Sequence, residues 1–183
     1  NPPLTTFVLG DSKEPKDTRR ILAQVKERVI RVSRELSEHH PGFSLQSTTH
    51  EALEQYRAEL LSDEFDLLKG TVKNRDITLK AKQVLTAGKI DHREFGALLS
   101  QHQAILRNVL HISTPKIDRM LEAGIAAGAY GGKINGSGGG GCMFVYAPEY
   151  PERVAEAIEQ VGGKAYVVNV DSGTKCEIME EVQ

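Results

Sequence analysis

The chain has 183 residues, and its 23 lysines and arginines nearly balance its 25 aspartates and glutamates. The formal net charge of −2 gives no indication of binding to nucleic acid or to an anionic membrane surface, and no apolar run approaches the roughly 20 residues of a membrane span. Hydrophobic residues make up 39% of the sequence, which is ordinary for a globular protein, and the length allows one sizeable core or two small ones. The sequence shows no internal repeat and no low-complexity linker, so we expect one domain over residues 1–183.

The first half is expected to hold a strand and then long helices. Residues 4–9 are rich in β-branched and apolar side chains and run into a Gly-Asp-Ser turn signal. Apolar residues at steps of three and four over residues 22–36 predict an amphipathic helix. Thr48 and Glu51 are spaced as a capping box for a second helix. After a break near Ser62-Asp63, apolar residues at helical spacing over 65–79 predict a further helix, and Ala87-Gly88 is its expected end.

The second half begins with two more helices. Asp91 and Glu94 form another capping box, and the apolar pattern that follows runs to residue 109. Thr114-Pro115 combines a cap with a proline at the first helical position. We expect the buried side of this second helix to consist of Ile117, Met120, Leu121 and Ile125.

Short strands dominate the end of the chain. The pattern predicts strands on both sides of a glycine loop within 133–147, a helix over 151–161, a strand over 165–170 and a last strand over 176–179. This order favours an α+β fold, with a small antiparallel sheet packed against helices on one face. The chain starts without methionine and its first strand follows almost at once, which suggests a fragment of a longer protein.

The glycine loop is the most informative stretch. Residues 133–146 read Lys-Ile-Asn-Gly-Ser-Gly-Gly-Gly-Gly-Cys-Met-Phe-Val-Tyr, whereas a tight hairpin needs only one or two glycines. Five glycines are expensive in backbone entropy unless positive φ or a close approach requires them. Successive N–H groups in such a loop form a concavity that suits an anion. The alternative is a hairpin whose glycines serve only the fold.

Lys133 to Cys142 resembles the third, C-terminal motif of the GHMP kinases, the superfamily of galactokinase, mevalonate kinase and homoserine kinase. The approach to the loop, residues 128–133, is most similar to galactokinase-like sugar kinases. Residues 8–12 and 98–118 also resemble segments of that family. The resemblance covers nearly the whole chain, but only the C-terminal half of the family.

The resemblance implies a ferredoxin-like C-terminal domain of a kinase that moves the γ-phosphoryl of ATP to a sugar hydroxyl. It implies ATP and Mg held mainly by an N-terminal kinase domain, whose phosphate-binding motif we do not find here. In this chain it assigns cofactor binding to Gly136, Ser137, Gly138, Gly139, Gly140 and Gly141, and no catalytic residue or metal ligand. The expected partners are that N-terminal domain and a sugar substrate. The isolated domain is expected to be inactive.

Two other functions stay open. One is a mevalonate-kinase-like enzyme or another alcohol kinase of the superfamily. The family's sugar-contacting tyrosine near the start of this half is absent from residues 15–20, which leaves room for another sugar or a polyol. The other is a non-catalytic regulatory module that senses a small anion. A catalytic half should expose an apolar patch where its partner docks, and a module should not.

Other polar residues have simpler interpretations. We expect Lys133 to be a solvated edge residue, the alternative being a point charge that reaches a phosphate. We expect His102 to be a partly buried, hydrogen-bonded histidine, the alternative being a catalytic base. We expect Asp11 to be a turn residue bonded to its own backbone. Arg75 and its neighbour Asp76 either pair internally or face a missing half. Cys142 is expected to be a small strand residue. The two cysteines, Cys142 and Cys176, lack metal-ligand spacing and indicate reduced thiols in a cytoplasmic protein.

Overall fold

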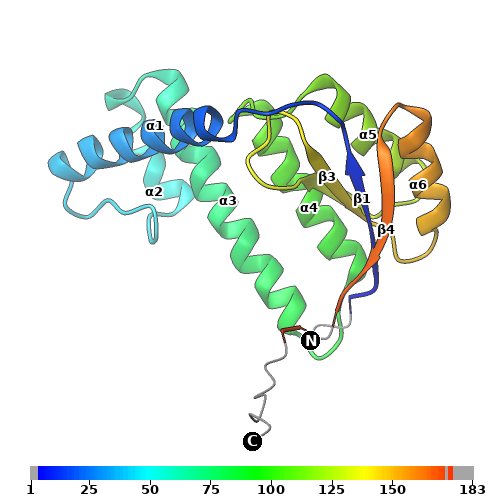
Figure 1. Ribbon diagram of the computed structural model, residues 1–183. Coiled ribbons are helices and arrows are strands. Elements are labelled where there is room, and N and C mark those ends of the chain that lie inside the picture. The colour runs from blue at the N-terminus through cyan, green and yellow to red at the C-terminus, as the bar shows by residue number, and fades with distance from the viewer. Residues whose placement is uncertain (1–3, 172, 175–183) are drawn as a thin grey trace, which may run out of the picture.

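The structure, a computed structural model, describes residues 4–171, 173 and 174 (Figure 1). It confirms the α+β class, and the strand expected over 176–179 lies outside the described residues. The elements in chain order are β1 (Thr6–Asp11), α1 (Thr18–His39), α2 (His50–Glu54), a 3-10 turn (Arg57–Glu59), α3 (Ser62–Thr86), α4 (His92–Asn108), α5 (Pro115–Ala126), β2 (Gly131–Ile134), β3 (Cys142–Tyr146), α6 (Pro151–Gln160) and β4 (Lys164–Asn169).

The four strands form one antiparallel sheet in the order β2-β3-β1-β4. With α5 and α6 this is the β-α-β-β-α-β arrangement of ferredoxin-like folds. Helices α5 and α6 pack on one face, where Val8 at the centre of β1 joins Met120, Val145 and Ile158 in a fully buried core. Helices α1 to α4 are therefore an insertion between β1 and α5 (Figure 1).

Helix α4 lies along the free edge of β2. The Ser100 hydroxyl accepts the N–H of Gly132 at 3.4 Å, and the Gln103 side-chain oxygen accepts the N–H of Ile134 at 2.9 Å. An edge strand otherwise presents unpaired backbone groups. Side chains of α4 thus take the place of a fifth strand, and they fix the strand from which the glycine loop departs.

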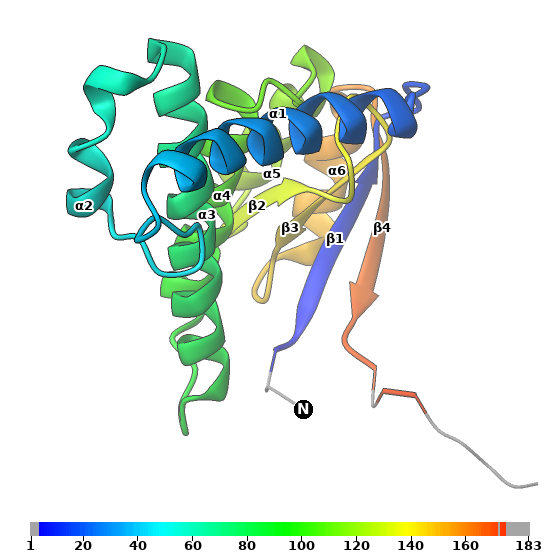
Figure 2. The same cartoon turned by 90° about the vertical axis from the view of Figure 1, so that its left-hand side faces the viewer.

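The face of the sheet opposite α5 and α6 is covered only in part. At one end Phe7 and Tyr146 pack edge-on against Phe95 of α4. Farther along, Leu9 pairs across the strands with Phe144 and with Tyr166, so these side chains share one face. Figure 2 shows this side of β1 and β4 turned to the viewer, with α1 crossing its upper end. We call Leu9, Phe144, Tyr166 and Val168 the open face.

Two local predictions are wrong. Thr48 does not cap a helix, because its Oγ1 accepts the N–H of Ser44, while Thr49 caps α2 by accepting the N–H of Ala52. The α2 helix is only five residues long, and the break near Ser62 is the start of α3. Ile125, expected on the buried side of α5, is 42% exposed.

No helix among the described residues is long and apolar enough to cross a membrane.

Candidate functional site

The loop between β2 and β3 has a backbone conformation that residues other than glycine rarely adopt. It runs over residues 135–141, between the last residue of β2 and the first of β3. Left-handed φ values strain any residue with a Cβ, so each such position explains one glycine. The values are +84° at Gly136, +77° at Gly138, +71° at Gly139, +124° at Gly140 and +72° at Gly141.

Two distant segments hold the loop in place. The N–H of Gly139 donates to the carbonyl of Ile112 at 2.7 Å, in the connection between α4 and α5. The N–H of Gly141 donates to the carbonyl of Glu14 at 3.1 Å, and the Gly141 carbonyl accepts the N–H of Ser12 at 2.9 Å. The loop is therefore fastened on both sides and is not a floppy hairpin.

Close contacts require glycine at two positions in particular. A Cβ at Gly138 would lie 2.4 Å from the carbonyl oxygen of Ile112. A Cβ at Gly140 would lie 2.9 Å from the carbonyl oxygen of Pro15. Both obstacles are backbone atoms, which cannot rotate away as a side chain can. Of the two explanations for the glycines, the close approach of another backbone applies at Gly138 and Gly140, in addition to positive φ.

Three backbone donors of the loop are unpaired among the described residues. The N–H groups of Ser137, Gly138 and Gly140 meet no acceptor among the described residues, although all three residues are buried. The Lys16 ammonium lies over the same loop, 3.0 Å from where a Cβ of Gly141 would stand. Buried N–H groups are nearly always paired, so unpaired ones beside a cation favour an anion or water at this place.

A buried glutamine supports the start of the loop, and our sequence reasoning did not single it out. Gln103 accepts from Ile134 and donates from its Nε2 to the Ser113 hydroxyl at 3.1 Å. The Ser113 hydroxyl donates in turn to Asp118 of α5 at 2.6 Å. The available signal was a polar residue beside the apolar stripe of α4, which alone does not identify its partners.

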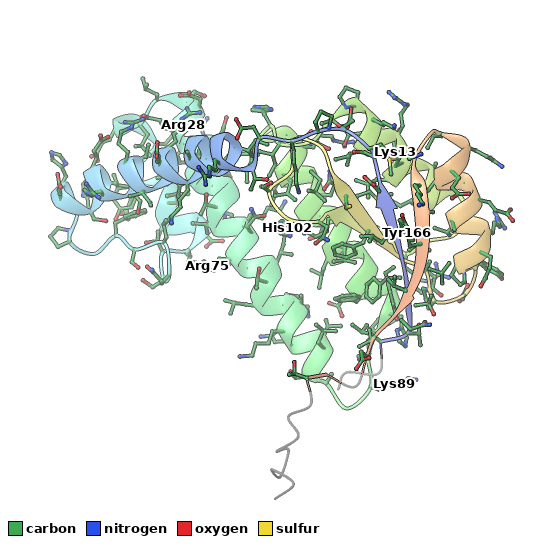
Figure 3. All side chains as sticks on the ribbon, viewed as in Figure 1. Lys13, Arg28, Arg75, Lys89, His102 and Tyr166 are labelled. Atoms are coloured by element: carbon green, nitrogen blue, oxygen red, sulfur yellow. The ribbon has the colours of Figure 1, made fainter. Side chains whose placement is uncertain are left out.

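Lys133 lies on the side of the open face, and its charge acts on His102 of α4. The Lys133 ammonium donates to the carbonyl of Ile134 at 2.6 Å and lies 5.3 Å from the centre of the Phe144 ring. Lys133 is half-buried, and burial lowers its pKa, so the prediction of a solvated edge residue is wrong. Burial, and next the Lys133 charge, lower the pKa of His102 to about 4. Figure 3 shows His102 between α3 and the strands.

The remaining predicted residues have structural roles. The Asp11 carboxylate accepts the N–H of Lys13 at 2.8 Å, as expected for a turn. Arg75 pairs with Asp76 at 2.7 Å and also donates to two carbonyls of the loop before α2, so the internal pairing is confirmed. Cys142 is a partly buried free thiol on β3. In the described part of the chain, no group of three His, Cys, Asp or Glu residues is placed to hold a metal.

Two cavities adjoin the site. A cavity of about 280 Å³ reaches the loop at Gly139, with Ile21, Val25 and Ile112 in its wall. A larger one of about 490 Å³ lies between α3 and α4. The two share Arg28, Val109 and His111 in their walls. Neither is lined by Lys16 or Lys133, so the cations near the loop do not face them.

Comparison with known proteins finds a matching family model and several similar kinases. Residues 82–166 match the family model described as GHMP kinases C terminal. The chain is 37% identical over 105 residues to the mevalonate kinase of Thermococcus onnurineus, covering 55% of this chain and 31% of that protein. It is 31% identical over 137 residues to the galactokinase of Homo sapiens, covering 72% of this chain and 34% of that protein.

Solved structures share the fold. The galactokinase of Lactococcus lactis complexed with galactose superposes with a TM-score of 0.77 at 18% identity, covering 92% of this chain and 45% of that chain. The mevalonate kinase of Methanococcus jannaschii gives a TM-score of 0.57 at 18% identity, covering 91% of this chain and 40% of that chain. The chain thus spans less than half the length of these relatives.

Proposed function

We propose that the chain, which is similar to the C-terminal part of GHMP kinases, forms the C-terminal half of an ATP-dependent kinase that phosphorylates an alcohol. The observation that carries this proposal is the set of unpaired N–H groups of Ser137, Gly138 and Gly140 beside the Lys16 ammonium. Phosphoryl transfer depends on positioned donors and positive charge around the phosphate oxygens.

Residues of this chain fit the anionic part of ATP. The N–H groups of the loop over Gly136 to Gly141 would donate hydrogen bonds to phosphate oxygens, and Lys16 would neutralise the charge of those oxygens. ATP itself supplies the phosphoryl group. The chain's contribution is to bind and orient the phosphates on a loop that Ile112 and Glu14 hold rigid. We assign Mg mainly to the N-terminal half, as the resemblance to the GHMP kinases implies.

A sugar hydroxyl is our first choice of acceptor, because the match to human galactokinase extends over 72% of the chain. Mevalonate is the second, because the matches to mevalonate kinases reach 38% identity over a shorter stretch. Both acceptors present an alcohol oxygen, which is all that the transfer itself requires. The acceptor contacts are assigned to residues outside the glycine loop.

An exposed apolar strip supports the presence of a partner half. Tyr166, Val167, Val168 and Val170 are 42%, 42%, 39% and 44% exposed on β4 and just after it. Large side chains that gather on one edge of a monomer commonly mark a contact surface. We assign this strip, with the open face, to the N-terminal half of the kinase. This assignment favours the catalytic half over the self-sufficient regulatory module.

Steady-state kinetics of the intact protein test the proposal. A panel of galactose, other hexoses, polyols and mevalonate is offered with Mg-ATP, and one acceptor should support turnover. Lys16→Met should lower kcat/KM for ATP about ten- to a hundredfold, because it removes a charged contact to phosphate. Lys82→Met, on the exposed side of α3, is the matched control and should change nothing.

Two outcomes would count against this function. Binding of ATP without transfer to any alcohol would favour the anion-sensing module. Turnover by residues 1–183 alone would show that the catalytic groups lie in this half, contrary to the assignment above.

A further inference from the structure

We propose that Lys133 marks the point on the open face at which the N-terminal half of the kinase inserts a carboxylate. The ion pair between Lys133 and this carboxylate, with His102 beside it, joins the two halves. This inference rests on the proposed function, since it needs an N-terminal half. It goes further by naming the residue, the face and the chemistry of the contact.

The Lys133 charge lacks a counter-ion within the described residues. Its ammonium donates only to the carbonyl of Ile134, one residue along its own strand. Other lysines with a close acidic neighbour behave differently: Lys69 pairs with Glu54 at 2.7 Å and Lys80 with Glu94 at 3.1 Å. A half-buried cation that is not paired is costly to keep charged.

The groups around Lys133 leave room for a negative charge. His102 faces it from α4 and is neutral at pH 7, because its pKa is lowered to about 4. Phe144 lies beneath the ammonium and offers only its ring. At the far end of the same face, Asp11 stands in register with Lys164. The Asp11 carboxylate already accepts the N–H of Lys13 in its own turn, so it is not the counter-ion of Lys133.

The surroundings favour a protein carboxylate over the phosphate of a small ligand. Apolar side chains of three strands extend from Lys133: Phe144 on β3, Leu9 on β1 and Tyr166 on β4. Figure 3 shows Tyr166 on the strand farthest from β2, so the apolar area crosses the sheet. A surface this broad suits a packed protein segment, and it surrounds the ion pair with groups that exclude water.

The position of the charge also separates it from the phosphate site. Lys133 lies three residues before Gly136, the first glycine of the loop, and its ammonium turns back to the carbonyl of Ile134. Lys16 is the cation that lies over the loop. Two lysines therefore serve two anions, one a phosphate at the loop and the other a side chain on the open face.

Zero-length cross-linking of the intact protein tests the inference. A water-soluble carbodiimide joins a lysine amine to a carboxylate only where the two are in contact. Peptide mass spectrometry should find Lys133 joined to one aspartate or glutamate that precedes residue 1. The Lys69–Glu54 and Lys80–Glu94 pairs are internal positive controls in the same sample.

A double-mutant cycle provides a second readout. Lys133→Met and the neutral amide variant of the cross-linked acid should each lower the melting temperature of the intact protein, and the double variant should lower it by less than the sum. Lys133→Arg should retain most of the stability, because it keeps the charge. Lys82→Met, an exposed lysine of α3, should have no effect.

Three results would overturn the inference: additive effects in the cycle, control cross-links without one at Lys133, or protection of the Lys133 amine from acylation only when ATP or the acceptor is added. The last result would assign Lys133 to a ligand phosphate. Phosphoryl transfer is measured on the same preparation. Its absence counts against the proposed function, whereas transfer without the cross-link overturns only this contact.

Discussion

Replacing Gly138 by alanine should destabilise the protein more than any ordinary surface substitution. The new methyl group would stand 2.4 Å from the Ile112 carbonyl oxygen, and its residue would have to keep a φ of +77°. The left-handed backbone costs about 1–2 kcal/mol. Relieving the clash by moving packed groups costs about 1–3 kcal/mol more. The expected loss is therefore about 2–5 kcal/mol.

For a domain of this size each kcal/mol lowers the melting temperature by about 2–4 °C, so Gly138→Ala should lower it by about 4–20 °C. Thermal and urea unfolding followed by circular dichroism measure this change. Gly88→Ala is the matched control, because nothing lies within 4 Å of its Cβ position and its φ is not left-handed. The control should be neutral or about 0.4–1 kcal/mol more stable. Equal stability of the two variants would refute the rigid, fastened loop.

Gln103→Leu should cost about 1–3 kcal/mol in urea unfolding, because the N–H of Ile134 loses its acceptor in a buried site; an unchanged midpoint would contradict this. The wild-type protein should lose stability as the pH falls from 6.5 toward 4, and His102→Gln should lose less. The folded pKa of His102, depressed by burial and by the Lys133 charge, lies below the unfolded value, so the unfolded chain binds the proton first. His111→Gly should be more stable than His111→Ala by about 1 kcal/mol in thermal melts, the reverse of the usual order, because φ is +52° at this residue.

Local signals predicted the helix starts well. Asp91 accepts the N–H of Glu94 at 2.9 Å, and Thr114 accepts the N–H of Ile117 at 3.2 Å. Each cap joins residues only three positions apart, so the short sequence motif is enough to predict it. The prediction that Thr48 caps the helix failed because the adjacent Thr49 is equally suited to that role. Which of the two threonines caps α2 depends on how the preceding loop closes.

Tertiary contacts explain what the sequence did not predict. Lys133 has the position of a solvated edge residue, yet α4 lies along that edge and Phe144 lies under the ammonium. The glycines of the loop were identified, but their anchors at Glu14 and Ile112 come from segments far away in the chain. Such contacts follow from the inserted helices and leave no periodic pattern in the sequence.

The measurement that tests the central claim most directly is an amide NMR titration of the intact protein with ATP. The account predicts that the backbone signals of Ser137, Gly138 and Gly140 shift first and most, since their N–H groups have no acceptor among the described residues. Lys16→Met should weaken the same shifts. If ATP is turned over while these three signals stay in place, the glycine loop does not hold the phosphates and the account is contradicted.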